Sequence, residues 1–337
     1  MNSDRAAIIG TDPISASIAL ALRGQKTPIT LVGYDARRPV AGLAKARGIF
    51  DEVRRKPGAA CRGAHLVIVS EPLARIEETF AAISADLEPG ALVTDTVRLK
   101  APVMRWAEEL LPPRVSFVGG HPVPNPAVVG LEPLESLDDA SAELLKGGLY
   151  CFTPSPRASS AAVEACSWLA HTVGADPFFL DVTEHDGLQA GVEGLPDLIS
   201  IALLRATVDT PGWEEMRKFA GSSFAAATEG VDEGSNQHLS LLLNRENIAR
   251  RLDALMEELR YLRIVLNEAD ESVLAEISSE AAQSRKRWMA KRREGMWAED
   301  REAGTRDVPG AGEQMRRMLL GDLGSRRRGA RDESREA

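Results

Sequence analysis

The chain has 337 residues, of which 44% are hydrophobic and 27% are charged, and its formal net charge is −9. This composition is typical of a soluble globular protein with two domains, and the negative charge argues against nucleic acid as the main partner. No apolar run approaches the roughly 20 residues of a membrane helix. The opening segment, MNSDRAAIIG, lacks the apolar core of a signal peptide. We therefore expect a cytoplasmic protein with no membrane or nucleic-acid partner.

The cysteines do not indicate a metal site. Cys61, Cys151 and Cys166 are scattered along the chain and lack the paired spacing of metal ligands. We expect three buried thiols in a reducing compartment and no bound metal.

The first half of the chain alternates short apolar runs with helix-like stretches. The first run, RAAIIG, precedes a predicted helix from Pro13 to Arg23. The later runs are PITLVGYD, AHLVIVSEP, ALVTDTV, VSFVGGHP, GLYCFTP and PFFLDV. Nearly all-apolar strands separated by crossover helices indicate a parallel sheet that is buried on both faces. The pattern predicts an α/β, doubly wound domain of Rossmann type over residues 1–182.

The rest of the chain is predicted to be helical over residues 184–208, 213–229 and 236–280. Thr183 is expected to cap the first of these helices, with Asp186 as its reciprocal partner. A stripe of apolar side chains recurs at intervals of three and four residues: Ile248, Leu252, Leu255, Leu259, Leu262 and Leu266. Such a stripe needs an apolar partner, which is either this chain's own core or a second copy of the chain.

We assign residues 183–284 to a helical dimerisation and substrate domain. Residues 285–337 contain 15 basic and 10 acidic side chains, unlike the acidic remainder of the chain. We expect a charged helical extension there, followed by a disordered tail, because this composition does not support a core.

Residues 8–22, IIGTDPISASIALAL, stand where a dinucleotide-binding domain carries Gly-x-Gly-x-x-Gly. Gly10 keeps the tight turn of the first glycine. Ser15 and Ala16, near the third position, are small enough for the helix to pack closely on the strand. Asp12 replaces the second glycine, which normally lets the backbone approach the pyrophosphate.

Asp12 followed by Pro13 is also a strong helix start, with a carboxylate N-cap and a proline at the first helical position. The Asp12 carboxylate is expected to accept hydrogen bonds from the backbone N–H of Ile14 or Ser15. Those N–H groups are donors that a pyrophosphate would use. A self-capped helix and a working nucleotide loop therefore remain two open interpretations of this segment.

The second apolar run ends at Asp35, 25 residues after Gly10. NAD-binding domains carry a carboxylate near this position for the ribose hydroxyls. Arg37 and Arg38 follow and would suit a 2′-phosphate, but an aspartate at the strand end disfavours that group. We expect NAD rather than NADP as the cofactor. The expected contacts are Gly10, Thr11, Asp12, Pro13, Ile14, Asp35 and Ser70.

A series of motifs spans roughly residues 6–270: IIG…SIALAL, GYD, GIFDEV, LEPGALVTDTVRLK, FVGGHPV, EHD, GLPDLISIAL, AGSSF and NRE. Their order resembles that of the prephenate and arogenate dehydrogenases of tyrosine biosynthesis. The most specific element is Thr-Asp-x-x-x-x-Lys followed by Gly-Gly-His-Pro. The resemblance implies a Rossmann domain, a helical dimerisation domain and an active site between them. It also implies NAD(P)-dependent oxidation and decarboxylation of prephenate, arogenate or a related ring acid by a homodimer.

His121, in GGHPV, falls on the catalytic histidine of that family. A histidine suits the removal of a ring-hydroxyl proton because its pKa lies near the operating pH. The two preceding glycines and the following proline indicate a loop at the carboxyl end of a strand, where ligands bind in such sheets. The other histidines are interpreted as structural, including His185 in the first turn of a helix.

Several positions depart from the family pattern. Arg98 stands in place of a serine, Gly194 and Asp197 in place of histidines, and Glu229 in place of an arginine. Glu71 replaces an apolar residue beside the nicotinamide. Because these positions normally bind the substrate, we expect Arg98, Gly194 and Glu229 to line its site.

Two interpretations of Arg98 stay open. It either anchors the substrate's acid group from the Rossmann side or pairs with Glu229 across an empty cleft. The alternative to an enzyme is a non-catalytic homologue, acting as a dimeric binding or regulatory protein.

Overall fold

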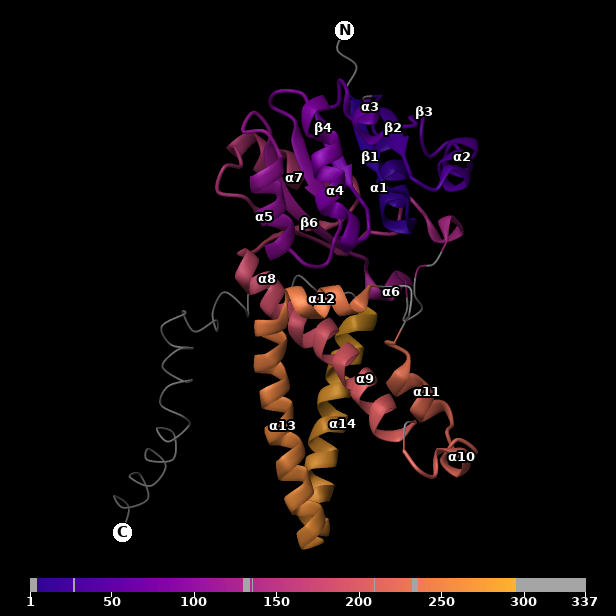
Figure 1. Cartoon of the computed structure of the whole chain (residues 1–337), viewed down its shortest axis with the longest axis vertical. Coiled ribbons are helices and arrows are strands. Elements are labelled where there is room, and N and C mark those ends of the chain that lie inside the picture. The colour runs from indigo at the N-terminus through magenta and orange to yellow at the C-terminus, as the bar shows by residue number, and fades with distance from the viewer. Residues whose placement is uncertain are drawn as a thin grey trace, which may run out of the picture. The chain divides into compact units, whose positions relative to one another are not determined.

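The computed structural model describes residues 5–26, 28–129, 134, 136–208, 210–231 and 236–294. Its N-terminal part is one eight-stranded sheet in the order β3-β2-β1-β4-β5-β6-β7-β8 (Figure 1). The strands are β1 (Arg5–Ile9), β2 (Thr30–Tyr34), β3 (Glu52–Val53), β4 (Leu66–Val69), β5 (Leu92–Asp95), β6 (Ser116–Val123), β7 (Leu149–Pro154) and β8 (Asp176–Phe179). This is the predicted Rossmann-type architecture. The two-residue strand β3 was not among the predicted runs.

The sheet is not parallel throughout, so that expectation was wrong at one pair. β6 and β7 run antiparallel, with His121 opposite Cys151, whereas the other neighbours are parallel. The described part of the β6–β7 connection holds only two short helical segments, α6 (Pro126–Val129) and a 3₁₀ turn, Leu137–Asp139. A parallel return needs a long crossover, usually a helix, and an apolar run alone does not encode strand direction.

Helices cover both faces of the sheet. On one face lie α1 (Pro13–Arg23), α2 (Arg38–Ala46) and α7 (Ser160–Thr172), and on the other α3 (Pro57–Cys61), α4 (Leu73–Ile83) and α5 (Ala101–Leu110). Side chains of β1 alternate between the two cores: Ala6 and Ile8 enter one, and Ala7 and Ile9 enter the other. The predicted helix from Pro13 to Arg23 is confirmed at both ends, and all three cysteines are buried as expected.

The C-terminal part is helical. One continuous helix comprises α8 (Val182–Gln189), a π-helical turn, η3 (Ala190–Gly194), and α9 (Leu195–Thr207). The remaining helices are α10 (Trp213–Met216), α11 (Ser222–Thr228), α12 (Gln237–Leu243), α13 (Arg245–Glu268) and α14 (Glu271–Glu294). The long helices α13 and α14 run side by side (Figure 1).

The predicted helical stretches are confirmed in type, but two of them are interrupted. Residues 213–229 divide into α10 and α11, and residues 236–280 break at Asn244 and again at Ala269. Ala269 ends α13 in the left-handed conformation, with φ of 52°. The predicted charged extension begins within α14, and its residues 295–337 lie outside the described part of the chain.

The start of α8 differs from the expected capping arrangement. Asp181 is the N-cap, and its side chain accepts a hydrogen bond from the Thr183 N–H at 2.7 Å. Thr183 is therefore not the cap. Asp186 is not its partner either, because its carboxylate is buried against the start of α5.

One helix of the described chain, residues 182–207, is long and apolar enough to cross a membrane by length and composition alone. This differs from the expectation that no segment reaches that length. The same helix carries His185 and Asp186, whose side chains are 2% exposed and bond to other parts of the protein.

Candidate active site

The loop between β1 and α1 has the tight turn of a nucleotide-binding domain. Gly10 has φ of +89°, and a Cβ added there would lie 2.1 Å from the backbone oxygen of Ser70. Only glycine is compatible with this close approach of the β1 and β4 ends. The turn therefore retains the geometry that brings a ligand to the start of α1.

Asp12 caps α1, as the self-cap interpretation predicts. Its Oδ1 accepts from the Ser15 N–H at 2.7 Å, while the Asp12 N–H donates to Ser15 Oγ at 3.0 Å. Its Oδ2 accepts from Ser70 Oγ at 2.9 Å. Pro13 occupies the first turn, which adds no N–H donor of its own. A fixed carboxylate thus sits on the helix N-terminus that would otherwise attract an anion.

Asp35 is buried at the end of β2 and is fully engaged. Its carboxylate accepts hydrogen bonds from the Thr11 N–H and from the backbone and guanidinium of Arg37, at 2.7–3.1 Å. Arg37 also donates to the Thr11 carbonyl at 2.8 Å. The side chain of Asp35 is 3% exposed and that of Arg37 is 66% exposed. The charge presented to solvent here is therefore the guanidinium.

The contacts of Asp12 and Asp35 decide whether a dinucleotide fits this loop. The turn at Gly10 and the carboxylate of Asp35 fit the adenosine ribose, provided that Arg37 shifts to share that carboxylate. A pyrophosphate fits the start of α1 only after the Asp12 carboxylate has left Ser15, because both use the same N–H group. The site fits the group once Arg37 and the Asp12 carboxylate have both moved.

Glu71 follows Ser70 and is also buried. Its side chain is 5% exposed and lies 3.4 Å from Arg75, one turn along α4. Burial raises the pKa of Glu71, while Arg75 opposes that shift. Glu71 therefore adds to this loop a carboxylic acid whose negative charge Arg75 partly balances.

A buried ion pair fixes the backbone before His121. Lys100 donates to the Asp95 carboxylate and, at 2.6 Å, to the Gly120 carbonyl. Asp95 in turn accepts from the Gly120 N–H at 3.0 Å. Both side chains are at most 1% exposed. The Thr-Asp-x-x-x-x-Lys motif thus holds the glycine that precedes the histidine.

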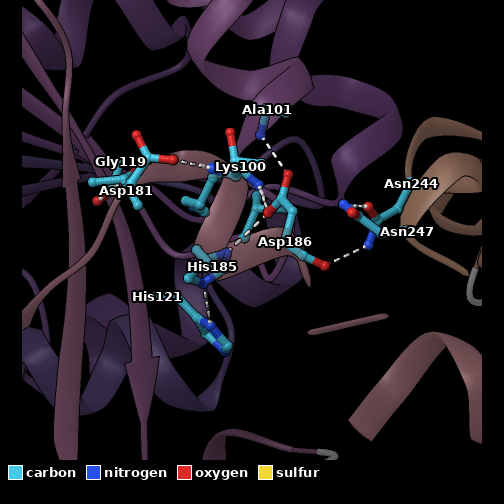
Figure 2. Close-up of polar contacts among 12 residues, drawn as sticks. Lys100, Ala101, Gly119, His121, Asp181, His185, Asp186, Asn244 and Asn247 are labelled. Atoms are coloured by element: carbon cyan, nitrogen blue, oxygen red, sulfur yellow. Dashed lines mark hydrogen bonds and ion pairs between the residues drawn. The ribbon is translucent and has the colours of Figure 1, made fainter. Parts of the chain in front are cut away.

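A chain of buried polar side chains runs from His121 to α5 (Figure 2). His121 Nδ1 lies 3.0 Å from His185 Nε2, and His185 Nδ1 lies 2.9 Å from Asp186 Oδ1. The Asp186 carboxylate accepts from the N–H groups of Lys100 and Ala101 at 2.8 and 2.7 Å. It therefore caps α5 from another helix and orders the histidines as well.

The hydrogen-bond chain defines which nitrogens carry protons. The Asp186 carboxylate accepts, so His185 Nδ1 donates and its Nε2 is left to accept. His121 Nδ1 then donates to His185, which leaves His121 Nε2 without a proton. Burial is the largest cause that lowers the pKa of His121 well below 6.5, and the positive charges of Lys100 and Arg98 add to the shift. His121 is thus a neutral base at neutral pH.

A cavity of about 600 Å³ lies between the loops after β4 and β5 and the helical part. Arg98, Glu193, Gly194, Asp197 and Gln237 contribute to its lining. A Cβ added to Gly194 would lie 2.8 Å from Ile248 Cδ1, so Ile248 fills the space beside that position. The π-helical turn that contains Glu193 and Gly194 is a deformation often found at functional sites.

The structure brings together only some of the residues that were predicted to bind the substrate. Arg98 and Gly194 line the cavity, whereas Glu229 ends α11 in an exposed position and does not line it. Arg98 pairs with Glu193 Oε2 at 2.8 Å, so of its two open interpretations the one that pairs it with Glu229 is wrong. Burial raises the pKa of Asp197, and Glu193 adds to that shift. The cavity therefore holds one arginine and two acids.

Sequence reasoning did not assign the residues that order His121. His185 was interpreted as part of a helix start, but its ring is buried against the ring of His121 with centroids 5.2 Å apart. Asp186, Asp95 and Lys100 were likewise given no role at the site. The EHD and Thr-Asp-x-x-x-x-Lys motifs were the available signal, because each joins an acid to a base at short spacing.

Comparison with known proteins assigns both parts of this architecture. Residues 18–177 match the family model for the nucleotide-binding domain of prephenate dehydrogenase, and residues 181–280 match its dimerization domain. The chain belongs to the prephenate dehydrogenase family. It is accordingly a dehydrogenase-type oxidoreductase of this family, with a nucleotide-binding domain.

Two curated relatives cover most of the chain. Prephenate dehydrogenase of Bacillus subtilis is 24% identical over 79% of this chain and 71% of its own length. Cyclohexadienyl dehydrogenase of Zymomonas mobilis is 25% identical over 83% of this chain and 94% of its own length.

Solved structures show the same fold. Prephenate dehydrogenase of A. aeolicus, in complex with hydroxyphenyl propionate and NAD+, has a TM-score of 0.74 at 23% identity and covers 84% of this chain and 98% of its own. Synechocystis arogenate dehydrogenase has a TM-score of 0.69 at 20% identity and covers 84% of this chain and 99% of its own.

Proposed function

We propose that this protein is a homodimeric, NAD-dependent dehydrogenase that oxidises and decarboxylates a cyclohexadienyl ring acid of the prephenate or arogenate type. The observation that carries the proposal is the chain from Asp186 through His185 to His121. It leaves a neutral imidazole nitrogen, His121 Nε2, available as a proton acceptor. We also propose domain boundaries after residues 182 and 284; the family matches over residues 18–177 and 181–280 support divisions near these positions.

In the proposed reaction His121 Nε2 accepts the proton of the ring hydroxyl. The carbon that bears this hydroxyl loses a hydride, the ring carboxylate leaves as carbon dioxide, and the ring becomes aromatic. When bound, the nicotinamide accepts the hydride. His185 stabilises the imidazolium that forms on His121, since Asp186 balances the charge that spreads along the chain. The burial of all three groups strengthens these interactions.

For the cofactor we propose NAD, held through Gly10, Thr11, Ile14, Asp35 and Ser70, with Asp12 displaced from the helix start. Support comes from the buried carboxylate at the end of β2, which would repel a 2′-phosphate. Arg37 offsets part of that charge, so the preference is expected to be moderate. Titration of the purified protein with NADH and NADPH, followed by nicotinamide fluorescence, tests it: tighter NADPH binding would refute the proposal.

Within the ring acids we propose that arogenate is preferred over prephenate. Arg98 offers a bidentate partner to one carboxylate, while Glu193 and Asp197 face the same cavity. Both ring acids carry two carboxylates, but arogenate also carries an ammonium group where prephenate has a ketone. The ammonium group can pair with Glu193 or Asp197, and a ketone cannot. Steady-state assays with both substrates test this, and a higher kcat/KM for prephenate would refute it.

We propose that the helical part forms the dimer. Several of its large apolar side chains are exposed: Leu188, Val192, Ile199, Phe219, Leu242, Leu259, Ile264 and Leu266. The matching of this part to a dimerization domain supports a second copy as the cover. The unpaired, buried cysteines support the proposed cytoplasmic location, since a reducing compartment keeps thiols free.

The first experiment is an assay of NADH formation with arogenate or prephenate and NAD, on wild type and on His185→Gln. We expect turnover in the wild type and a lower kcat with an altered pH profile in the variant, because His121 loses its ordered tautomer. The matched control, His171→Gln, changes an exposed histidine at the end of α7. NADH binding without turnover on any ring acid would favour the non-catalytic binding protein instead.

A further inference from the structure

A cavity that the proposed reaction does not use lies at the opposite edge of the sheet, where the strands begin. It has a volume of about 690 Å³ and is lined where β1, β4 and β5 begin, by Arg5, Leu66 and Leu92. The same three strands end at Gly10, Ser70 and Asp95, the residues of the candidate active site. Five extended residues span about 16 Å, so this edge cavity is separate from the catalytic cleft.

The edge cavity has the size and composition of a small-molecule site. Ile29, Leu66, Leu92 and the indole of Trp168 form its apolar walls. Among the described residues that line it, the ionisable side chains are Arg5, Lys26 and His65, and none of them is acidic. Ligand pockets of about 300–1,000 Å³ combine such walls with a few polar groups.

Arg5 supplies an unused hydrogen-bond donor. Its Nη2 lies 3.1 Å from Glu52 Oε2, whereas its Nε is buried and has no partner among the described residues. Leaving a buried donor unpaired is costly, so the position favours an acceptor that the described part of the chain does not provide. A carboxylate suits this position because the guanidinium presents donors in a planar fork.

We propose that the edge cavity is a second binding site, and that it takes a small aromatic acid whose ring lies against Trp168 and whose anionic group bonds to Arg5. Trp168 is exposed on α7, where no other function uses it. Lys26 supplies a second positive charge to the lining. The inference does not depend on turnover or on the dinucleotide.

The test uses 8-anilinonaphthalene-1-sulfonate, a fluorescent aromatic anion, on the full chain. The variants are Arg5→Gln and Trp168→Ala. Arg54→Gln is the matched control, because Arg54 also pairs with Glu52 but does not line the cavity. Trp288→Ala is the control for the aromatic change, since Trp288 is similarly exposed on α14. Arg98→Ser reports binding in the catalytic cleft.

We expect the dissociation constant for the probe to rise at least tenfold in Arg5→Gln and Trp168→Ala and to stay unchanged in the two controls and in Arg98→Ser. Neutral N-phenyl-1-naphthylamine should bind more weakly and be insensitive to Arg5→Gln. The proposal is overturned if the probe does not bind, if Arg54→Gln weakens it as much as Arg5→Gln, or if only Arg98→Ser weakens it. Failure of dehydrogenase activity alters none of these readouts.

Discussion

The sheet-containing part and the helical part bury their apolar side chains very differently. The two cores of the sheet, one on each face, enclose every strand from β1 to β7 except the short β3. In the described helical part, only Ala190, Ile248 and Val265 are buried among the apolar residues. A domain is stabilised mainly by burying apolar surface, and within one chain the sheet-containing part buries far more of it than the described helical part does.

Buried polar groups also join the two parts. Asp186 on α8 bonds to the start of α5, and Asn244 donates to the Asp186 carbonyl at 2.9 Å. Buried polar networks are costly unless fully paired, so they define one arrangement of the parts they join. Here the arrangement that joins the helical part to the sheet is the same one that orients His121.

The largest expected effect lies at this junction. Replacing His121 with Gln should lower kcat by about 10²–10⁴-fold, because the reaction loses its general base. NADH affinity should stay close to that of the wild type. Steady-state kinetics and a binding titration measure the two quantities, and a loss below tenfold would remove His121 as the base.

The exposed apolar side chains of the helical part predict a second effect, on the stability of the dimer. The Leu259→Asp, Leu266→Asp double variant should raise the dimer dissociation constant by at least about 100-fold, since unpaired charges would enter an apolar interface. Both side chains are more than half exposed in one chain. Sedimentation velocity measures the change.

The control for this experiment is Leu43→Asp, which changes a 44%-exposed leucine on the sheet side and should leave the dimer intact. If wild type is a monomer at micromolar concentration, or if both variants behave alike, the helical part does not need a second copy. The contrast in burial would then require another explanation.

Arg98 tests whether the cleft between the parts binds an acid. Its pair with Glu193 is exposed, with side chains 71% and 47% accessible, so it contributes little to stability. Arg98→Ser should weaken ring-acid binding about tenfold and leave the melting temperature unchanged. Thermal shift with arogenate and prephenate separates the two outcomes. A lower melting temperature with unchanged ligand affinity would make the pair structural.

Features that depend on local sequence patterns could be predicted from the sequence, and features that depend on distant parts of the chain could not. The apolar runs and the Asp12–Pro13 start located the strands and the ends of α1, because local patterns decide them. Strand direction at β7 depends on the path of the connection. The interruptions at Asn244 and Ala269 occur without proline or glycine, so composition gave no signal for them.

Site prediction failed where partners are distant in the chain. Asp186 lies 86 residues from Lys100, and Arg98 lies 95 residues from Glu193. Sequence spacing does not reveal such pairs without the fold. Glu229 was assigned to the cavity through the resemblance, but the end of α11 carries it to an exposed position.

A smaller effect should appear in the pH dependence of stability. The pKa of His121 is lower in the folded protein than its usual 6.5, so the unfolded chain binds a proton that the native one does not. This group's contribution to stability is therefore present above pH 6.5. It is lost as the pH falls below 6.5 toward the folded-state pKa.

The slope from one such proton is about 1.4 kcal/mol per pH unit. Urea unfolding between pH 7.5 and 5 should show this loss in the wild type and a reduced slope in His121→Gln. An identical slope in both would mean that His121 is protonated in the native state, which contradicts the neutral tautomer inferred from the hydrogen-bond chain.

The smallest expected effect concerns the loop on the sheet side. Asp12→Gly should tighten NADH binding by about fivefold, since a negative charge at the helix start disfavours the pyrophosphate by roughly 1 kcal/mol. It should cost only a few tenths of a kcal/mol in stability, because glycine is a tolerable N-cap. Calorimetric titration and denaturant unfolding measure the two quantities.

Asp12→Asn distinguishes the effect of the negative charge from the effect of the side chain's hydrogen bond to the Ser15 N–H. Asparagine is as good an N-cap as aspartate, so the first turn stays capped while the charge is removed. If repulsion is the obstacle, Asp12→Asn should recover most of the gain in affinity. If the carboxylate merely occupies the Ser15 N–H, only the glycine variant should bind more tightly. Weaker binding in both variants would mean that Asp12 helps to hold the cofactor, for example through a ribose hydroxyl or a water. The nucleotide loop would then bind its cofactor without displacement of Asp12.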